Sequence, residues 1–69
     1  MSTYLVIQHF SWCLVRAPSL KAAMDYAESA VNGGRVSAYP VDSYMFAQEV
    51  NKLVGVGMEF KGYFEWEPK

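Results

Sequence analysis

The sequence contains a single cysteine, Cys13, and few other metal-ligating residues near it. A lone cysteine cannot form an internal disulfide, which excludes the disulfide framework typical of very small secreted domains. His9 and Cys13 are close in sequence, but an extended chain would separate their Cα atoms by about 13 Å. Two ligands of one zinc ion must lie closer, and no further soft ligand is available. We therefore predict no metal site, no cofactor and, since no catalytic motif is present, no enzymatic activity.

Positive charge is also scarce. Six Lys and Arg residues are dispersed along the chain against seven Asp and Glu, which gives a formal net charge of −1. Nucleic-acid-binding proteins carry a basic patch, so this balance argues against that class of partner. No apolar run approaches the roughly 18 residues of a membrane span, and the N-terminus lacks the features of a signal peptide. Together with the free cysteine, these absences predict a cytoplasmic protein that does not associate with membranes.

Apolar residues, in contrast, are abundant: they make up 52% of the 69 residues, and 16% of the chain is aromatic. This length predicts one domain spanning residues 1–69. A chain this short buries only about 60% of the surface that its unfolded form exposes. Small domains with surplus apolar surface commonly gain stability by association. We therefore expect a homodimer or a complex with a larger protein.

The clearest helical pattern lies in residues 17–32. Ser19 is a suitable N-cap, Lys21 and Asp25 can pair one turn apart, and residues 32–34 supply a left-handed stop. The predicted core face repeats with the helical period and consists of Leu20, Ala23, Met24, Ala27, Ala30 and Val31. The many alanines on this face predict close packing against a sheet.

Two apolar runs precede this helix. Residues 3–10 contain a continuous apolar core at 4–7, which predicts a central strand covered on both faces. Residues 12–16 form a second run, so the two runs are either a hairpin or one long bent strand. No Gly, Asn or Asp is available for a tight two-residue turn, so we favour a hairpin with a wider turn.

Three elements are predicted after the helix. Residues 35–41 read as a strand that Pro40 confines to an edge or an end. Asp42 and Ser43 can cap a second helix that Gly55 ends, and its predicted apolar face comprises Phe46, Ala47, Val50, Leu53 and Val54. Residues 58–66 alternate as a half-buried strand. Met58, Phe60, Phe64 and Trp66 are expected on one face. A solvent face of net negative charge is expected on the other, with Glu59, Lys61, Tyr63, Glu65 and Glu67.

The predicted order is β-β-α-β-α-β. We expect an α+β fold with a small, mainly antiparallel sheet and both helices packed on one face. On that arrangement Trp12, Tyr39 and Tyr63 remain on the open face, and an exposed apolar patch commonly marks an interaction surface.

The candidate functional residues are therefore contact residues. Carboxylates do acid–base chemistry only where a pocket shifts a pKa, whereas carboxylates on an open strand face serve solubility or partner binding. A nucleophilic Cys13 would need a nearby cation, but a strand directs Arg16 to the opposite face, so Cys13 is assigned to the core. The predicted partner-binding residues are Tyr44, Met45, Glu59, Tyr63, Glu65, Trp66 and Glu67.

The N-terminal part of the chain resembles small proteins of phages and mobile elements, including some anti-CRISPR inhibitors. The resemblance rests on the strand that begins Met-Ser-Thr-Tyr-Leu-Val and, after a second strand, on Val15-Arg16-Ala17-Pro18-Ser19-Leu20-Lys21-Ala22-Ala23. It reaches the end of the first helix, whereas the second helix, at residues 43–54, departs from the simplest members. It implies a small standalone inhibitor of a host machine and assigns no functional residue.

These observations predict a non-enzymatic protein–protein interaction module. In its most specific form it is a phage-encoded inhibitor that sterically occludes a host protein or complex, such as a CRISPR or other defence component. One alternative is a structural or regulatory homodimer joined through an edge strand. The other is a small ligand-binding subunit.

Overall fold

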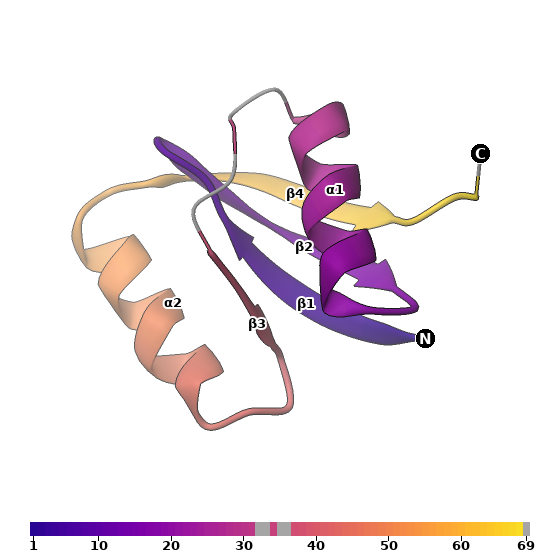
Figure 1. Cartoon of the computed structure of the whole chain (residues 1–69). Coiled ribbons are helices and arrows are strands. Elements are labelled where there is room, and N and C mark those ends of the chain that lie inside the picture. The colour runs from indigo at the N-terminus through magenta and orange to yellow at the C-terminus, as the bar shows by residue number, and fades with distance from the viewer. Residues whose placement is uncertain (32–33, 35–36, 69) are drawn as a thin grey trace.

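The computed structural model describes residues 1–31, 34 and 37–68. The element order is β-β-α-β-α-β, as the sequence predicts (Figure 1). The elements are β1 (Ser2–Ile7), β2 (Ser11–Ala17), α1 (Leu20–Ala30), β3 (Ser37–Pro40), α2 (Met45–Gly55) and β4 (Glu59–Glu65). Within these described ranges, no helix is long and apolar enough to cross a membrane.

Strands β1 and β2 form the predicted antiparallel hairpin, in register from Ser2–Ala17 to Ile7–Trp12. The turn between them is tighter than predicted: Ile7 lies opposite Trp12, and the Gln8 amide donates to the Ser11 carbonyl at 2.8 Å, so only His9 and Phe10 form the loop. No described non-glycine residue has a positive φ, so His9 and Phe10 close this loop without the left-handed conformations for which Gly, Asn or Asp is usually needed. The hairpin is therefore confirmed over the single bent strand.

The sheet has the order β3-β1-β2-β4. Strand β1 pairs antiparallel with β2 and with β3, and β2 pairs parallel with β4. The sheet is thus mixed, with two antiparallel pairings and one parallel pairing. Pro40 ends the edge strand β3, where its missing N–H costs no ladder bond. The first two residues predicted for this strand, 35 and 36, lie outside the described residues.

The two helices cover opposite faces of the sheet, so the prediction that they share one face is wrong. Val6 and Cys13 pack with Ala23 of α1, whereas their chain neighbours Leu5 and Trp12 pack with Leu53 of α2. Because successive side chains of a strand point to opposite faces, these two clusters lie on the two sides of the sheet. The continuous apolar run of β1 is covered on both faces, as its sequence predicts.

Chain connectivity gives the physical reason. Both β2 and β3 run antiparallel to β1, and β4 is parallel to β2, so three strands point the same way. The connection through α1 crosses the sheet from β2 to β3, and the connection through α2 crosses back from β3 to β4. Connections between parallel strands are almost always right-handed. Two right-handed crossings in opposite directions place their helices on opposite faces.

Helix α1 has the predicted N-cap and the predicted ion pair, but the face that it turns to the core differs from the predicted one. The Ser19 hydroxyl accepts from the Ala22 amide at 3.1 Å, and Lys21 pairs with Asp25 at 2.8 Å. Ala23 and Ala27 are fully buried as expected. Leu20 and Ala30 are exposed, while Ala22 and Tyr26 join the packing instead. The predicted stop at residues 32 and 33 lies outside the described residues.

Helix α2 differs from its prediction at its start. It begins at Met45, and its N-cap residue, Tyr44, makes no side-chain cap hydrogen bond. The Ser43 hydroxyl instead donates to the Pro40 carbonyl at 2.8 Å and closes the turn that follows β3. Of the predicted apolar face, Leu53 is buried, Phe46 and Val50 are half-buried, and Ala47 and Val54 are exposed. Few of its side chains therefore enter the core.

Candidate functional site

Strand β4 is the least covered element of the sheet. It pairs with β2 on one side and has no strand partner on the other within the described chain. All of its residues are exposed or half-buried. Helix α1 packs on β1, β2 and β3, and α2 packs against β3. Among the described residues neither helix packs extensively on β4, although Tyr26 of α1 reaches Phe64, so the strand is left open along its outer edge, over most of its α2 side and over part of its α1 side.

A β-bulge divides β4 into two segments. Trp12 pairs with Phe60 and Leu14 with Tyr63, so β4 uses one more residue than β2 over this step. Gly62 lies in this step with a φ of 118°, a conformation that residues with a Cβ rarely adopt. The extra residue reverses the side-chain alternation beyond it. An isolated Gly inside a strand pattern is the sequence signal for such a bulge.

The bulge overturns the predicted division of β4 into an apolar and an acidic face. Phe60 lies on the α2 side, where its ring centroid is 4.4 Å from that of Trp12. Tyr63 and Glu65 lie on the same side, paired with Leu14 and Arg16. Glu59 lies instead on the α1 side, together with Lys61 and Phe64. Each face of β4 therefore carries both aromatic and charged side chains.

The carboxylates of β4 are paired with cations. Glu59 lies 3.0 Å from Lys61, and Glu65 lies 3.5 Å from Arg16. The Tyr63 hydroxyl donates to Glu65 at 3.3 Å. All of these groups are largely exposed, and exposed pairs of this kind contribute little stability. They do reduce the net charge of the strand, so the predicted solvent face of net negative charge does not form on β4.

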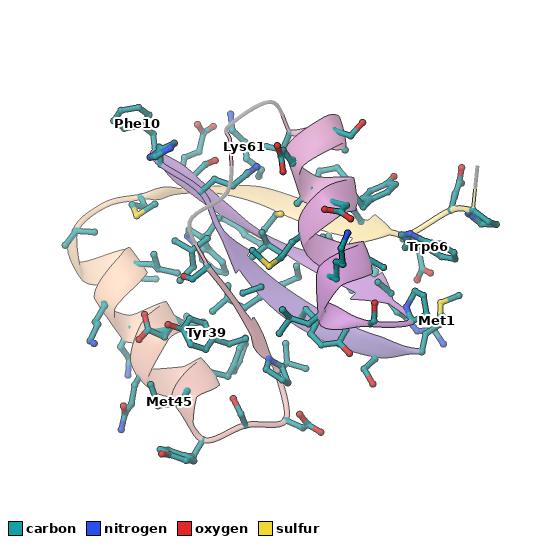
Figure 2. All side chains as sticks on the ribbon, in the orientation of Figure 1. Met1, Phe10, Tyr39, Met45, Lys61 and Trp66 are labelled. Carbon is teal, nitrogen blue, oxygen red and sulfur yellow. The ribbon has the colours of Figure 1, made fainter. Side chains whose placement is uncertain are left out.

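The predicted partner-binding residues do not form one surface. Tyr44 and Met45 lie at the start of α2, directly after β3, whereas Glu59, Tyr63 and Glu65 belong to β4 at the opposite edge of the sheet. Figure 2 shows Met45 and Trp66 at well-separated positions. Tyr44 is 82% exposed. The structure thus brings together the predicted residues of β4 and its C-terminal continuation, and separates the pair on α2.

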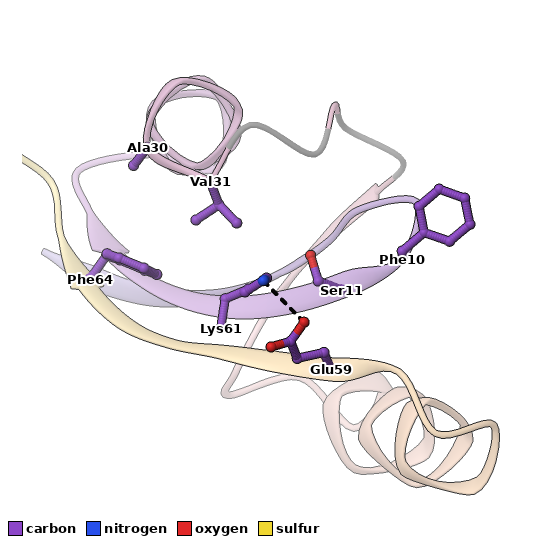
Figure 3. A pocket seen from close by; sticks show the side chains of 7 residues that line it. All are labelled: Phe10, Ser11, Ala30, Val31, Glu59, Lys61 and Phe64. Carbon is purple, nitrogen blue, oxygen red and sulfur yellow. Dashed lines mark ion pairs between the residues drawn. The ribbon is translucent and has the colours of Figure 1, made fainter.

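Two grooves flank β4 on its α1 side. The first, of about 480 Å³, lies near the hairpin turn, and Figure 3 shows α1 above it and the sheet below. Its lining consists of Phe10, Ser11, Ala30, Val31, Glu59, Lys61 and Phe64. The Glu59–Lys61 ion pair lies at its rim, and Phe10 is 87% exposed. Sequence reasoning missed Phe10 because it was assigned to a strand.

The second groove, which we call the Trp66 pocket, lies beside the C-terminal end of β4. It has a volume of about 520 Å³, and its lining consists of Asp25, Tyr26, Ser29, Ala30, Trp66, Glu67 and Pro68. Helix α1 supplies one wall, and the segment that follows β4 supplies the other. Of the predicted contact residues, Trp66 and Glu67 belong here. Sequence reasoning did not single out Asp25 or Tyr26, because neither belongs to the predicted core face of the helix.

Cys13 lacks the environment of a reactive thiol. It is fully buried between the sheet and α1, and burial raises its pKa to about 11. At neutral pH the nucleophilic thiolate form is therefore scarce. His9 is exposed in the turn of the hairpin. In the part of the chain that the structure describes, no three His, Cys, Asp or Glu side chains gather as a metal site would require.

Comparison of the chain with protein-family models, with curated proteins and with solved structures finds no match.

Proposed function

We propose that this protein is a non-enzymatic interaction module that binds a protein partner through β4. One observation carries the proposal: neither helix packs extensively on β4 among the described residues, which leaves the strand exposed on its outer edge and over most of its α2 side. The outer edge of such a strand presents backbone N–H and C=O groups that a partner chain can pair with. Its faces supply the side-chain contacts that select the partner.

Exposed aromatic side chains strengthen this proposal. Phe60 is 48% exposed and Tyr63 is 52% exposed, and both lie on the α2 side of β4. Aromatic residues of this kind carry much of the binding energy at protein interfaces, because they bury large areas at a low cost in side-chain entropy. Phe60 is held against Trp12, so its ring is already positioned.

Steric occlusion is the mechanism that fits these features. A rigid sheet edge with aromatic flanks can cover a functional surface of its target without chemistry of its own. The inhibitor hypothesis, with a phage-encoded protein that blocks a host defence component, is the specific form of this proposal. Its motivation is the resemblance of the N-terminal segment to small phage inhibitors.

Self-association through β4 is disfavoured by the same strand. The Gly62 bulge interrupts the regular spacing of backbone groups, and Glu59, Lys61 and Glu65 place charges along the strand. Bulges and charges hinder regular edge pairing with any chain, and a second copy would bring a second bulge and a second set of the same charges into the pairing. We therefore propose a different protein as the partner.

The test is affinity purification of the tagged protein from cells that naturally contain it, followed by native mass spectrometry. Tyr63→Lys alters β4, and Tyr44→Lys is the matched control, since it replaces another exposed tyrosine at the opposite sheet edge. We expect the wild type and Tyr44→Lys to retain one partner at a fixed stoichiometry. Tyr63→Lys should reduce its capture about tenfold or more, as loss of an interface anchor does. Equal capture by both variants, or only self-association of the wild type, would contradict the proposal.

A further inference from the structure

The Trp66 pocket combines two aromatic rings with two carboxylates. Tyr26 and Trp66 supply the rings, and Asp25 and Glu67 supply the carboxylates. The face of an aromatic ring carries partial negative charge and attracts a cation placed over it. A nearby carboxylate favours the same ligand through charge and hydrogen bonding. The lining as a whole is therefore complementary to an organic cation.

Both aromatic walls are held in place by the core. Tyr26 and Trp66 pack against the buried cluster under α1, and the Tyr26 ring centroid lies 6.4 Å from that of Phe64. The Trp66 amide donates to the Arg16 carbonyl at 2.9 Å, which continues the pairing of β4 with β2 beyond Glu65. A ligand would therefore meet rings that are already ordered, which lowers the entropic cost of binding.

The polar groups of the pocket come from both walls. Asp25 and Ser29 are one helical turn apart on α1 and line the pocket together. Asp25 also pairs with Lys21 at 2.8 Å, so its charge is partly compensated. Glu67 precedes Pro68, and a residue before proline is restricted to extended conformations. This restriction limits the positions available to the Glu67 carboxylate on the second wall.

We infer that the Trp66 pocket receives an arginine side chain from a basic segment of the protein partner. The inference rests on the proposed function and adds the chemistry of the partner. Charge complementarity selects a cation, and the two rings favour the planar guanidinium, which stacks on aromatic faces better than an ammonium group does. The groove volume of about 520 Å³ lies in the range of pockets that hold small ligands, so it has room for a whole side chain.

The test is a titration of the nitrogen-15-labelled protein with the tripeptide acetyl-Gly-Arg-Gly-amide, followed by nuclear magnetic resonance. We expect saturable shifts of the Trp66 indole N–H and of the Tyr26 and Ser29 amides. The indole N–H of Trp12, which is buried on the other face of the sheet, serves as an internal reference and should not move. The same peptide with citrulline, a neutral isostere of arginine, should bind about tenfold more weakly.

Two variants complete the experiment. Glu67→Gln removes one carboxylate from an exposed position and should weaken arginine binding about fivefold, as the loss of a charge-assisted contact does. Glu49→Gln, on α2, is the matched control and should leave binding unchanged. Equal binding of the arginine and citrulline peptides, or shifts that avoid Trp66, would overturn the inference. Tighter binding of spermidine than of the peptide would also overturn it, because the pocket would then serve a free polyamine.

The outcome of the peptide titration is independent of the outcome of the partner-capture experiment that tests the proposed function. If the arginine peptide fails to bind while Tyr63→Lys still abolishes partner capture, the inference is wrong and the proposed function stands. If the peptide binds while Tyr63→Lys and Tyr44→Lys capture the partner equally, the proposed role of β4 is wrong and the cation pocket stands.

Discussion

At the scale of single residues, Gln8 links the hairpin to helix α1. Its side chain is 1% exposed, and its amide nitrogen lies within hydrogen-bond distance of the carbonyls of Ala27, Val31 and Gly34, at 3.2, 3.3 and 2.8 Å. The last carbonyls of a helix lack partners within the helix, so a buried helix end needs donors from elsewhere. Gln8 supplies a donor at that point. Nothing in the sequence around Gln8 indicates this role, because the contact joins segments far apart in the chain.

We predict that Gln8→Leu destabilises the protein by about 1–3 kcal/mol, because leucine is similar in size but cannot donate to the part-buried carbonyls of Val31 and Gly34. Urea denaturation followed by circular dichroism measures the effect. Gln48→Leu is the matched control, since Gln48 is exposed on α2. Superimposable unfolding curves for the two variants would show that the contacts of Gln8 do not stabilise the fold.

At the scale of elements, α2 ends at Gly55, as predicted, but the left-handed residue that terminates it is Gly57. Gly57 has a φ of 76°, its amide donates to the Val54 carbonyl at 3.1 Å, and the Met58 amide donates to the Leu53 carbonyl at 3.0 Å. These two bonds form a Schellman motif, and the side chains of Met58 and Leu53 pack in one cluster, as is common for that motif. The motif positions the chain for entry into β4.

The two glycines provide a matched pair of substitutions, because an added Cβ would meet no atom within 4 Å at either position. Gly57→Ala should cost about 1 kcal/mol, since alanine disfavours the left-handed conformation. Gly55→Ala should be neutral or stabilise by up to about 1 kcal/mol, because Gly55 lies in the last turn of the helix. Thermal unfolding of both variants measures the difference. A loss of stability in Gly55→Ala equal to that in Gly57→Ala would refute this assignment.

Sequence patterns predicted these elements well where the relevant physics is local. The helical period and the hydroxyl of Ser19 identify α1, and the apolar runs identify the hairpin. The wrong predictions concern side chains whose exposure or direction depends on contacts between segments far apart in the chain. Leu20 matches the helical period but is exposed, because the sheet lies nearer to Ala22 and Tyr26. The bulge at Gly62 shifts every later side chain of β4, so strict alternation placed Glu59 and Glu65 on one face.

At the scale of the whole molecule, the positions of the two helices determine which surface is available. They cover opposite faces and both pack on β3, whereas neither packs extensively on β4 among the described residues, so β4 is the more exposed edge strand. The α+β class and the element order were predictable from the sequence, but the sheet order was not, and the exposure of β4 follows from that order. Trp12, expected on an open face, is only 9% exposed because Phe60 and α2 cover it. Tyr63 is the residue of that expected patch that stays exposed.

The most direct test of the account is hydrogen–deuterium exchange of the protein, free and bound to the partner that it captures. Amides of β4 that point away from β2 have no strand partner in the described chain and should exchange rapidly in the free protein. The account predicts that binding slows exchange across Glu59–Glu65 and leaves the start of α2, around Tyr44, unchanged. Protection confined to β3 and the start of α2, with β4 unchanged, would contradict it.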